Sequence, residues 1–470
     1  MYRPLAALLV AGAIAQPNPC GTGQVRLALT SATDGSEMRV AWATGNTTTP
    51  ARYAGVVKYG RSPGALTMTS AAADSRNYTL CELASVHLHS AVMTGLAAGE
   101  TFYYSVTEPR CGATAPVKFT APRAVGDKAT AYPFTVFAYG DMGVTNSQPV
   151  IDLIAERVGA GSGPDVVTHA GDISYADNRR CPRYDSVQDL YYDMISAYAS
   201  HTPVMFSSGS VARARARAGE RSLKLTHPSP LARPCSNHEI FGADAKGDFL
   251  AYRTRVSPTM PIADPIATPF WYSFNAGRVH FLAFDIDQPY EKGSAQYDFI
   301  LADLKAVDRS VTPIVYAYEH FPLFCTNFFW CIDEKTGEAA GKPAAFRALY
   351  EPIFNAPETR VHVFVAGHVH AAEIAFPVAT GSLVPSQKDF KGISTTFYAM
   401  FGFPGDEEVC CNGWITPKPA LTAWRTDDVA KDGGTFGFGE FEFTSDTSFT
   451  FKAWSGVNKT VLFQTDVTFA

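Results

Sequence analysis

From about residue 130 onward, apolar runs rich in β-forming residues alternate with stretches of helical period, and this alternation constrains the fold most. One helical face carries Val150, Ile151, Ile154 and Val158, and a second carries Val187, Leu190, Tyr191, Met194 and Tyr198. Such alternation predicts βαβ units in a layered α/β domain. The apolar runs are residues 134–139, 166–168, 204–206, 314–318 and 361–366.

Short polar motifs follow these runs, the third of them after an interruption. In α/β sheets ligands bind beyond the carboxyl ends of the strands, so motifs that are far apart in sequence can converge on one site. Carboxylates, a phenol, an amide and imidazoles suit a trivalent iron beside a softer divalent ion, and a metal pair predicts hydrolysis. The candidate ligands are Asp141, Asp172, Tyr175, Asn237, His320, His368 and His370.

The first quarter of the chain has a different pattern, with short strand-like runs, turn signals and no good helical period. The runs 39–42, 55–59 and 101–106 are spaced as in a β-sandwich. We therefore expect an all-β, fibronectin III-like domain at 22–125 and an α/β catalytic domain at 130–402. The alternating aromatic residues of 403–470 predict closing strands that pack on the catalytic domain.

Residues 1–15 combine an early positive charge with a short apolar run, as in a secretory signal peptide, although a buried first element is an alternative. Sequons at Asn46, Asn77 and Asn458 are typical of an exported glycoprotein. The net charge of -6 argues against nucleic-acid or anionic-membrane partners. No later segment has eighteen uninterrupted apolar residues. We expect a secreted or vacuolar-lysosomal protein without an integral membrane segment.

Nine cysteines leave one unpaired if the others form disulfides in an oxidising compartment. Cys325 and Cys331 are close enough in sequence to close a short loop. The sequence leaves the pairing of Cys20, Cys81, Cys111 and Cys181 open. Disulfide pairing is therefore predicted at one position only.

Five sequence blocks carry a resemblance to a known family. They are Gly140-Asp141-Met142-Gly143, Gly171-Asp172-Ile173-Ser174-Tyr175, Asn237-His238-Glu239, Tyr318-Glu319-His320 and Gly367-His368-Val369-His370. In order and residue pattern they resemble the sequence blocks of purple acid phosphatases, a branch of the metallophosphoesterase superfamily. The resemblance extends over nearly the whole chain. Tyr175 is the discriminating residue, because related phosphatases and nucleotidases lack it. The resemblance implies a β-sandwich core flanked by helices.

The resemblance also implies roles for individual residues. Asp141, Tyr175 and His370 would hold Fe(III), and Asp172 would bridge to a zinc, manganese or ferrous ion held by Asn237, His320 and His368. A catalytic His238 would face the phosphoryl group, and Glu239 would orient its neighbours. The implied activity is acid hydrolysis of small phosphate monoesters by attack of a metal hydroxide. A phosphodiesterase or nucleotide pyrophosphatase is the alternative, and a homodimer is compatible with the resemblance.

The chain departs from the family near two of the blocks. Many plant members carry paired histidines where this chain has Phe328-Phe329-Trp330, which affects leaving-group protonation and substrate preference. The last block continues as Ala371-Ala372-Glu373-Ile374, where the family commonly has a tyrosine and an arginine. This second departure changes the pocket wall and leaves the ligands in place.

The third block is interrupted by an insert, residues 210–236, which separates Gly209 from Asn237. Removing these 27 residues restores the sequence Gly-Asn-His-Glu, leaves eight cysteines and changes the net charge from -6 to -11. Three interpretations stay open: translated intron sequence, a disordered basic loop, or an electrostatic clamp for a polyanionic substrate. If the insert is present in the protein, activity is not automatically lost, but a changed turn before Asn237 would weaken the divalent site. A catalytically impaired secreted binding protein is then the alternative.

Overall fold

The computed structural model describes most of the chain beyond the predicted signal peptide. The described residues are 21–45, 55–80, 83–109, 112–179, 181–209, 238–239, 249–265, 267–326, 331, 341–405, 414–426 and 436–470. The predictions for residues 1–15, Asn46, the insert, Asn237 and 328–330 lie outside these ranges. Within the described ranges, no helix is both long enough and apolar enough to cross a bilayer.

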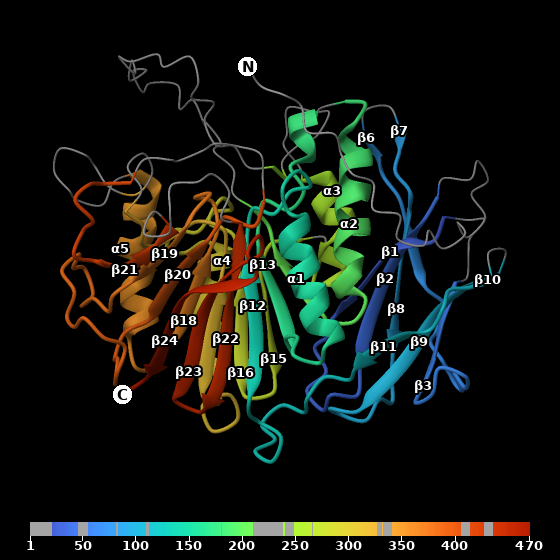
Figure 1. Ribbon diagram of the computed structural model, residues 1–470, viewed down its shortest axis with the longest axis horizontal. Helices are drawn as coiled ribbons and strands as arrows, with labels where there is room; N and C mark the ends of the chain where they lie inside the picture. The colour runs from blue at the N-terminus through green and yellow to red at the C-terminus, as the bar shows by residue number, and fades with distance from the viewer. Residues whose placement is uncertain are drawn as a thin grey trace.

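The N-terminal part is a sandwich of two antiparallel sheets (Figure 1). Its strands are β1 (Gly23–Ala28), β2 (Met38–Thr44), β3 (Val56–Gly60), β4 (Met68–Thr69), β5 (Asp74–Arg76), β6 (Thr79–Leu80), β7 (Leu83–Ala84), β8 (His87–Met93), β9 (Thr101–Glu108), β10 (Gly112–Ala113) and β11 (Val117–Thr120). One sheet has the order β1-β2-β8-β5. The other runs β10-β9-β3-β4, with β11 beside β9, while β6 and β7 pair with each other as a separate two-stranded sheet. Alternate side chains of β2 and β9, such as Trp42 and Tyr104, fill the space between the sheets.

Two larger sheets follow, and the first has six strands in the order β14-β13-β12-β22-β23-β24. They are β12 (Phe134–Tyr139), β13 (Val166–Ala170), β14 (Val204–Ser207), β22 (Gly437–Ser445), β23 (Ser448–Ser455) and β24 (Thr460–Thr468). The first three are parallel, and β22 pairs antiparallel with β12. The C-terminal strands thus continue the first sheet edge to edge, as the red strands beside β12 show in Figure 1.

The second sheet has seven strands in the order β15-β16-β17-β18-β20-β19-β21. They are β15 (Tyr272–Ala276), β16 (Val279–Ala283), β17 (Ile314–Tyr318), β18 (Val363–Ala366), β19 (Ala372–Ala375), β20 (Phe397–Phe401) and β21 (Thr422–Arg425). Strands β16, β17, β18 and β20 are parallel. Their inner faces meet those of the first sheet through aromatic side chains, including Tyr316 and Phe441, whose ring centroids are 5.5 Å apart.

Helices cover the outer faces, which completes the predicted β-sandwich flanked by helices. The first sheet carries α1 (Gln148–Gly159) and α2 (Tyr184–Ala199), and the second carries α4 (Ala295–Ala306) and α5 (Gly341–Asn355). Short elements are α3 (Leu250–Arg255), η1 (Ala176–Arg179) and η2 (Ser257–Thr259). Ile300 and Leu304 of α4 pack with Phe346 of α5 against Val315 of the sheet, so two apolar cores support one layered unit. The predicted fold class is confirmed.

The predicted buried face of α2 is partly wrong. Leu190 is 48% exposed, whereas Tyr184, Gln188, Tyr191, Ile195 and Tyr198 are buried. The buried stripe follows the tyrosines, which reach the core under β13, and position 190 lies about 100° around the helix from Tyr191. The sequence pattern predicted that Leu190 is buried because it is apolar. The helix instead turns its tyrosines toward the core, which leaves Leu190 in solvent.

Arg255 of α3 joins the N-terminal sandwich to the layered domain. Its guanidinium is 1% exposed, donates to Tyr78 Oη at 2.7 Å and pairs with Asp189 of α2 at 2.8 Å. Its backbone carbonyl accepts a hydrogen bond from Arg26 of β1. The two parts of the molecule therefore share a buried charged network as well as apolar contacts.

Candidate metal centre

The metal-ligand candidates lie where the parallel strands of both large sheets end. Asp141 follows β12 and Asp172 follows β13, while His320 follows β17 and His368 follows β18. Gly367 makes this approach of the two sheets possible, because a Cβ there would lie 2.3 Å from Asp141 Oδ2 and 3.2 Å from Gly140 Cα. Motifs from distant parts of the chain therefore share one buried site.

Asp141, Tyr175 and His370 form one half of the cluster. The Tyr175 hydroxyl donates to Asp141 Oδ1 at 3.0 Å and lies 2.9 Å from His370 Nε2. His370 Nε2 is 3.4 Å from the same Asp141 oxygen. A carboxylate, a phenol and an imidazole thus direct their ligand atoms to one point.

Asp172, His320 and His368 form the other half, and one ligand atom from each lies within 4.8 Å of the other two. His320 Nε2 is 3.1 Å from Asp172 Oδ2 and 3.2 Å from His368 Nδ1. The backbone N–H of His368 donates to Asp141 Oδ2 at 2.7 Å and so joins the two halves. The two halves are neighbouring parts of a single site.

Neighbouring groups fix the orientation of two of these imidazoles. His320 Nδ1 donates to the carbonyl of Ala170 at 2.8 Å, which directs Nε2 toward Asp172. Phe321 stacks on His368 with ring centroids 4.0 Å apart. The sequence analysis did not assign Phe321, and the only available signal was its position directly after His320.

His238 enters the site from the third block and is held by Asp177 of η1. Asp177 Oδ1 is 2.6 Å from His238 Nδ1, and the imidazole packs on the ring of Tyr175 at 3.9 Å between centroids. His238 Nε2, on the other side of the ring, is 3.9 Å from Asp172 Oδ2. Asp177 was also missed. It stands two residues after Tyr175, where a carboxylate is equally typical of a polar turn.

Glu239 ties the interrupted third block to the second block. Its carboxylate accepts backbone hydrogen bonds from Asp172 at 3.1 Å, Ile173 at 2.6 Å and Gly209 at 2.7 Å. A Cβ on Gly209 would lie 2.2 Å from Asp172 Oδ1 and 2.3 Å from Glu239 Oε2. The described residues that flank the insert therefore meet at the site.

Backbone strain is concentrated at the site. Asp141, Asp172, Tyr175 and His368 have φ between 49° and 70°, a region that residues other than glycine rarely adopt. Each such conformation costs on the order of 1 kcal/mol and persists only where the surroundings enforce it. Because all four belong to the cluster, the fold holds these side chains in fixed positions.

Comparisons with known proteins agree on one family. Residues 22–121 match the model described as Purple acid Phosphatase, N-terminal domain. Phosphoenolpyruvate phosphatase of Allium cepa is 25% identical over 382 residues, which are 78% of this chain and 68% of that protein. The chain is therefore similar to purple acid phosphatases. "Probable inactive purple acid phosphatase 9" of Arabidopsis thaliana is 26% identical over 300 residues, 60% of this chain and 42% of that protein, so the chain spans less than half of it.

A solved purple acid phosphatase has the same fold. The structure of PPD1 from yellow lupin (Lupinus luteus) seeds superposes with a TM-score of 0.72 and covers 96% of this chain and 75% of that one. The two sequences are 18% identical, so this likeness concerns the fold alone. It covers both the N-terminal sandwich and the layered domain.

The donor set of this site suits a pair of metal ions. Asp141 and Asp172 are buried, and among the described residues only histidines form ion pairs with them. Burial lowers the pKa of His320, but Asp172 and Asp141 outweigh it and raise that pKa to about 10. The cluster thus attracts positive charge, and carboxylate, phenol and imidazole donors fit metal ions.

Of the eight predicted site residues, the structure brings seven together, and Asn237 lies outside the described residues. His169, His280 and His362, which we did not assign to metal, have other contacts. His169 Nδ1 meets Tyr191 Oη at 2.9 Å, His280 lies between Asn275 and Asp303, and His362 accepts from the backbone of Val315. Burial lowers the pKa of His169 to about 3.

The predicted short loop between Cys325 and Cys331 is closed by a disulfide.

Proposed function

We propose that this chain is an acid phosphatase that hydrolyses small phosphate monoesters at a binuclear metal centre. The observation that carries the proposal is the convergence of Asp141, Asp172, Tyr175, His320, His368 and His370 beside a carboxylate-held histidine. A bound metal pair supplies Lewis acidity, which activates water and neutralises charge on phosphate oxygens. The carboxylates of Asp141 and Asp172 cannot neutralise this charge without metal ions, because they are themselves negative.

Each half of the cluster favours a different metal ion. Asp141, Tyr175 and His370 would hold Fe(III), because carboxylate and phenolate oxygens are hard donors. His320 and His368, with Asn237, would hold zinc, manganese or ferrous iron, and Asp172 would bridge. His320 and Asp172 supply adjacent donors at 3.1 Å, which supports a shared ligand there.

His238 would donate a proton or hydrogen bond to the phosphoryl group. Asp177 binds Nδ1, so Nε2 is directed toward the cluster. A positioned acid of this kind is typically worth about 10² to 10⁴ in rate.

Asp177→Asn keeps the shape of the side chain and removes its charge. We expect it to lower kcat by roughly 10-fold or more with a smaller effect on KM, and a steady-state comparison with wild type at acidic pH checks this.

Hydrolysis of chromogenic mono- and diesters at acidic pH tests the proposed activity. Faster cleavage of the monoester supports it, whereas a preference for the diester favours the phosphodiesterase alternative. Protein that contains both metals but cleaves neither substrate would support an impaired binding protein, which the interruption of the third block favours.

We further propose that the chain is exported after removal of residues 1–15, with the domain boundaries given above, and that it acts as a secreted or vacuolar glycoprotein. Asn77 and Asn458 are exposed, and Asn458 lies in the turn between β23 and β24, which suits glycosylation. Mass spectrometry of the mature protein tests both points. An N-terminus at Met1 and unmodified Asn77 and Asn458 would contradict them.

A further inference from the structure

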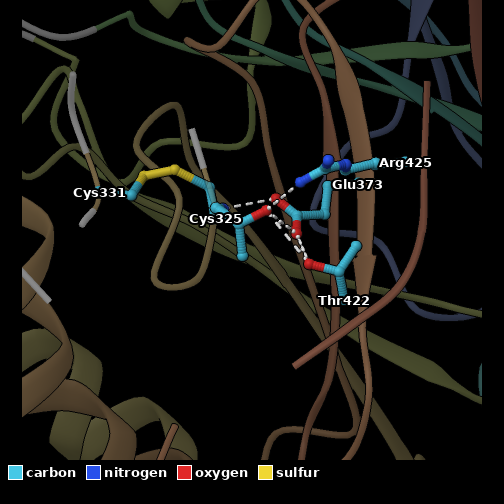
Figure 2. Close-up of a disulfide and its surroundings, with 6 residues drawn as sticks. Cys325, Cys331, Glu373, Thr422 and Arg425 are labelled. Atoms are coloured by element: carbon cyan, nitrogen blue, oxygen red, sulfur yellow. Dashed lines mark hydrogen bonds between the residues drawn. A yellow bond between two sulfur atoms is a disulfide. The ribbon is translucent and has the colours of Figure 1, made fainter. Parts of the chain in front are cut away.

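Glu373 of β19 is a buried carboxylate three residues after His370 and is 3% exposed. Its Oε2 accepts the backbone N–H of Thr326 at 2.7 Å. Its Oε1 accepts the hydroxyls of Thr326 at 2.7 Å and Thr422 at 2.6 Å (Figure 2). Arg425 Nη1 completes the group by donating to Thr326 Oγ1 at 3.4 Å. Both carboxylate oxygens are thus used to hold one loop residue.

This tether joins two segments that leave the metal centre separately. Thr326 lies six residues after His320, and Glu373 lies three residues after His370. Strand β19 is also held by its sheet partners, since Glu373 lies opposite Met400 and Arg425. Residues 319–326 form no strand or helix, and their backbone is held by hydrogen bonds from Glu319 to Val365, from Gly367 to His320 and from Ile415 to Thr326. Loss of the tether would therefore loosen the Thr326 end of this loop rather than the strand.

The Cys325–Cys331 disulfide fastens the same corner. The two cysteines pack in a small apolar cluster with Val369, Ala371 and Met400. Val369 separates His368 from His370 in the sequence. Figure 2 shows Glu373, Thr422 and Arg425 gathered on the Cys325 side of the disulfide. The disulfide and the tether thus hold the same end of the loop that follows His320.

We propose that Glu373 is a positioning residue for the divalent half of the metal centre, because it holds the loop that follows His320. The inference rests on the proposed function, which assigns His320 to the divalent ion. With the loop held, His320 Nε2 stays 3.1 Å from Asp172 and 3.2 Å from His368. Tyr175 contacts both Asp141 and His370 directly, so the iron half is independent of this loop.

Zinc binding by Glu373→Ala tests the proposal. The full-length protein is dialysed against a series of buffered free zinc concentrations, and bound zinc and iron are measured by elemental analysis. We expect zinc affinity about 10-fold weaker, the lower end of the effect of residues that orient ligands, and unchanged iron content. Glu373→Gln should lose less zinc affinity than Glu373→Ala, since the amide carbonyl oxygen of glutamine still accepts the threonine hydroxyls.

Two further variants make the result decisive. Glu440→Ala removes a buried carboxylate of β22 that contacts Arg157 and Trp454, and it should lower thermal stability without changing zinc affinity. Thr422→Val removes one donor to Glu373 and should weaken zinc binding slightly. Unchanged zinc affinity in folded Glu373→Ala overturns the proposal. If that variant does not fold, unchanged affinity in both Glu373→Gln and Thr422→Val overturns it. Zinc affinity is read without turnover, so absence of phosphatase activity would contradict the proposed function alone.

Discussion

At the scale of single residues, Gly367 shows how little space the metal centre leaves. A Cβ on Gly367 would lie 2.3 Å from Asp141 Oδ2 and 3.2 Å from Gly140 Cα, so the two sheets approach this closely only because position 367 has no side chain. We expect Gly367→Ala to displace Asp141 and to lower metal content at least about 10-fold. Elemental analysis of purified protein measures this effect.

Gly159→Ala provides the matched control for that substitution. Gly159 is the last residue of α1, and a Cβ there would meet no atom within 4 Å. Alanine is the better helix former by up to about 1 kcal/mol, so this variant should keep its metal and gain slight stability. Equal metal content in the two variants would show that the seam tolerates a side chain.

The sequence predicted the metal-site residues that stand in motifs and one residue that orients them, Glu239, but not Asp177 or Phe321. Asp141, Asp172 and His368 were recognisable because each follows an apolar run in a distinctive motif. Asp177 and Phe321 have no such signal, since a loop aspartate and a buried phenylalanine are common everywhere. Their contacts with His238 and His368 depend on how two sheets meet, which single-sequence patterns do not contain.

At the scale of elements, two buried glutamates respond oppositely to their surroundings. Burial raises the pKa of Glu108 on β9 above its ordinary value of 4.5, although Trp42 donates to it at 2.7 Å. Burial also acts on Glu440 of β22, but Arg157 and Lys452 outweigh it and lower the pKa. The same residue type therefore costs stability in one strand and contributes it in another.

We expect Glu108→Gln and Glu440→Gln to change the free energy of unfolding in opposite directions. At pH 7 the free energy of unfolding of Glu108→Gln should exceed that of wild type by roughly 1 kcal/mol, because glutamine keeps the Trp42 contact without a buried charge. This gain should vanish below about pH 4.5, where the wild-type carboxyl is protonated. Glu440→Gln should lose about 1 to 3 kcal/mol at pH 7, and the loss should shrink as the pH falls below 4.5. Urea unfolding from pH 3 to 7 measures both. Parallel pH profiles for the two variants would contradict the assignment.

At the scale of the whole molecule, Arg255 links the sandwich to the layered domain. Arg255→Ala leaves Asp189 and Tyr78 without this partner, so we expect a loss of about 3 to 5 kcal/mol in the free energy of unfolding. Arg61→Ala is the control, because the Arg61–Glu100 pair is exposed and worth about 0 to 1 kcal/mol. Chemical denaturation measures both, and equal small losses would show that the interdomain network is not stabilising.

Deletion of residues 210–236 tests whether the insert matters to the whole protein. Gly209 already donates to Glu239, so joining Gly209 to Asn237 should preserve the fold and retain or increase metal content and phosphatase activity. Thermal unfolding and steady-state rates measure the outcome. Loss of activity in a folded deletion variant would show that the insert contributes to function. Tryptic peptides of the native protein would show independently whether these residues are present.

The pairing of β22 with β12 has a consequence for how the protein is made. Strand β12 carries Asp141 at its end, and one of its two neighbours, β22, leaves the ribosome long after β12 itself. Until then, one edge of β12 has no partner, and unpaired strand edges invite aggregation. The N-terminal sandwich can fold early during synthesis, whereas the first large sheet has to wait. Cellular yield should therefore depend on protecting this edge during translation as much as on the stability of the finished fold.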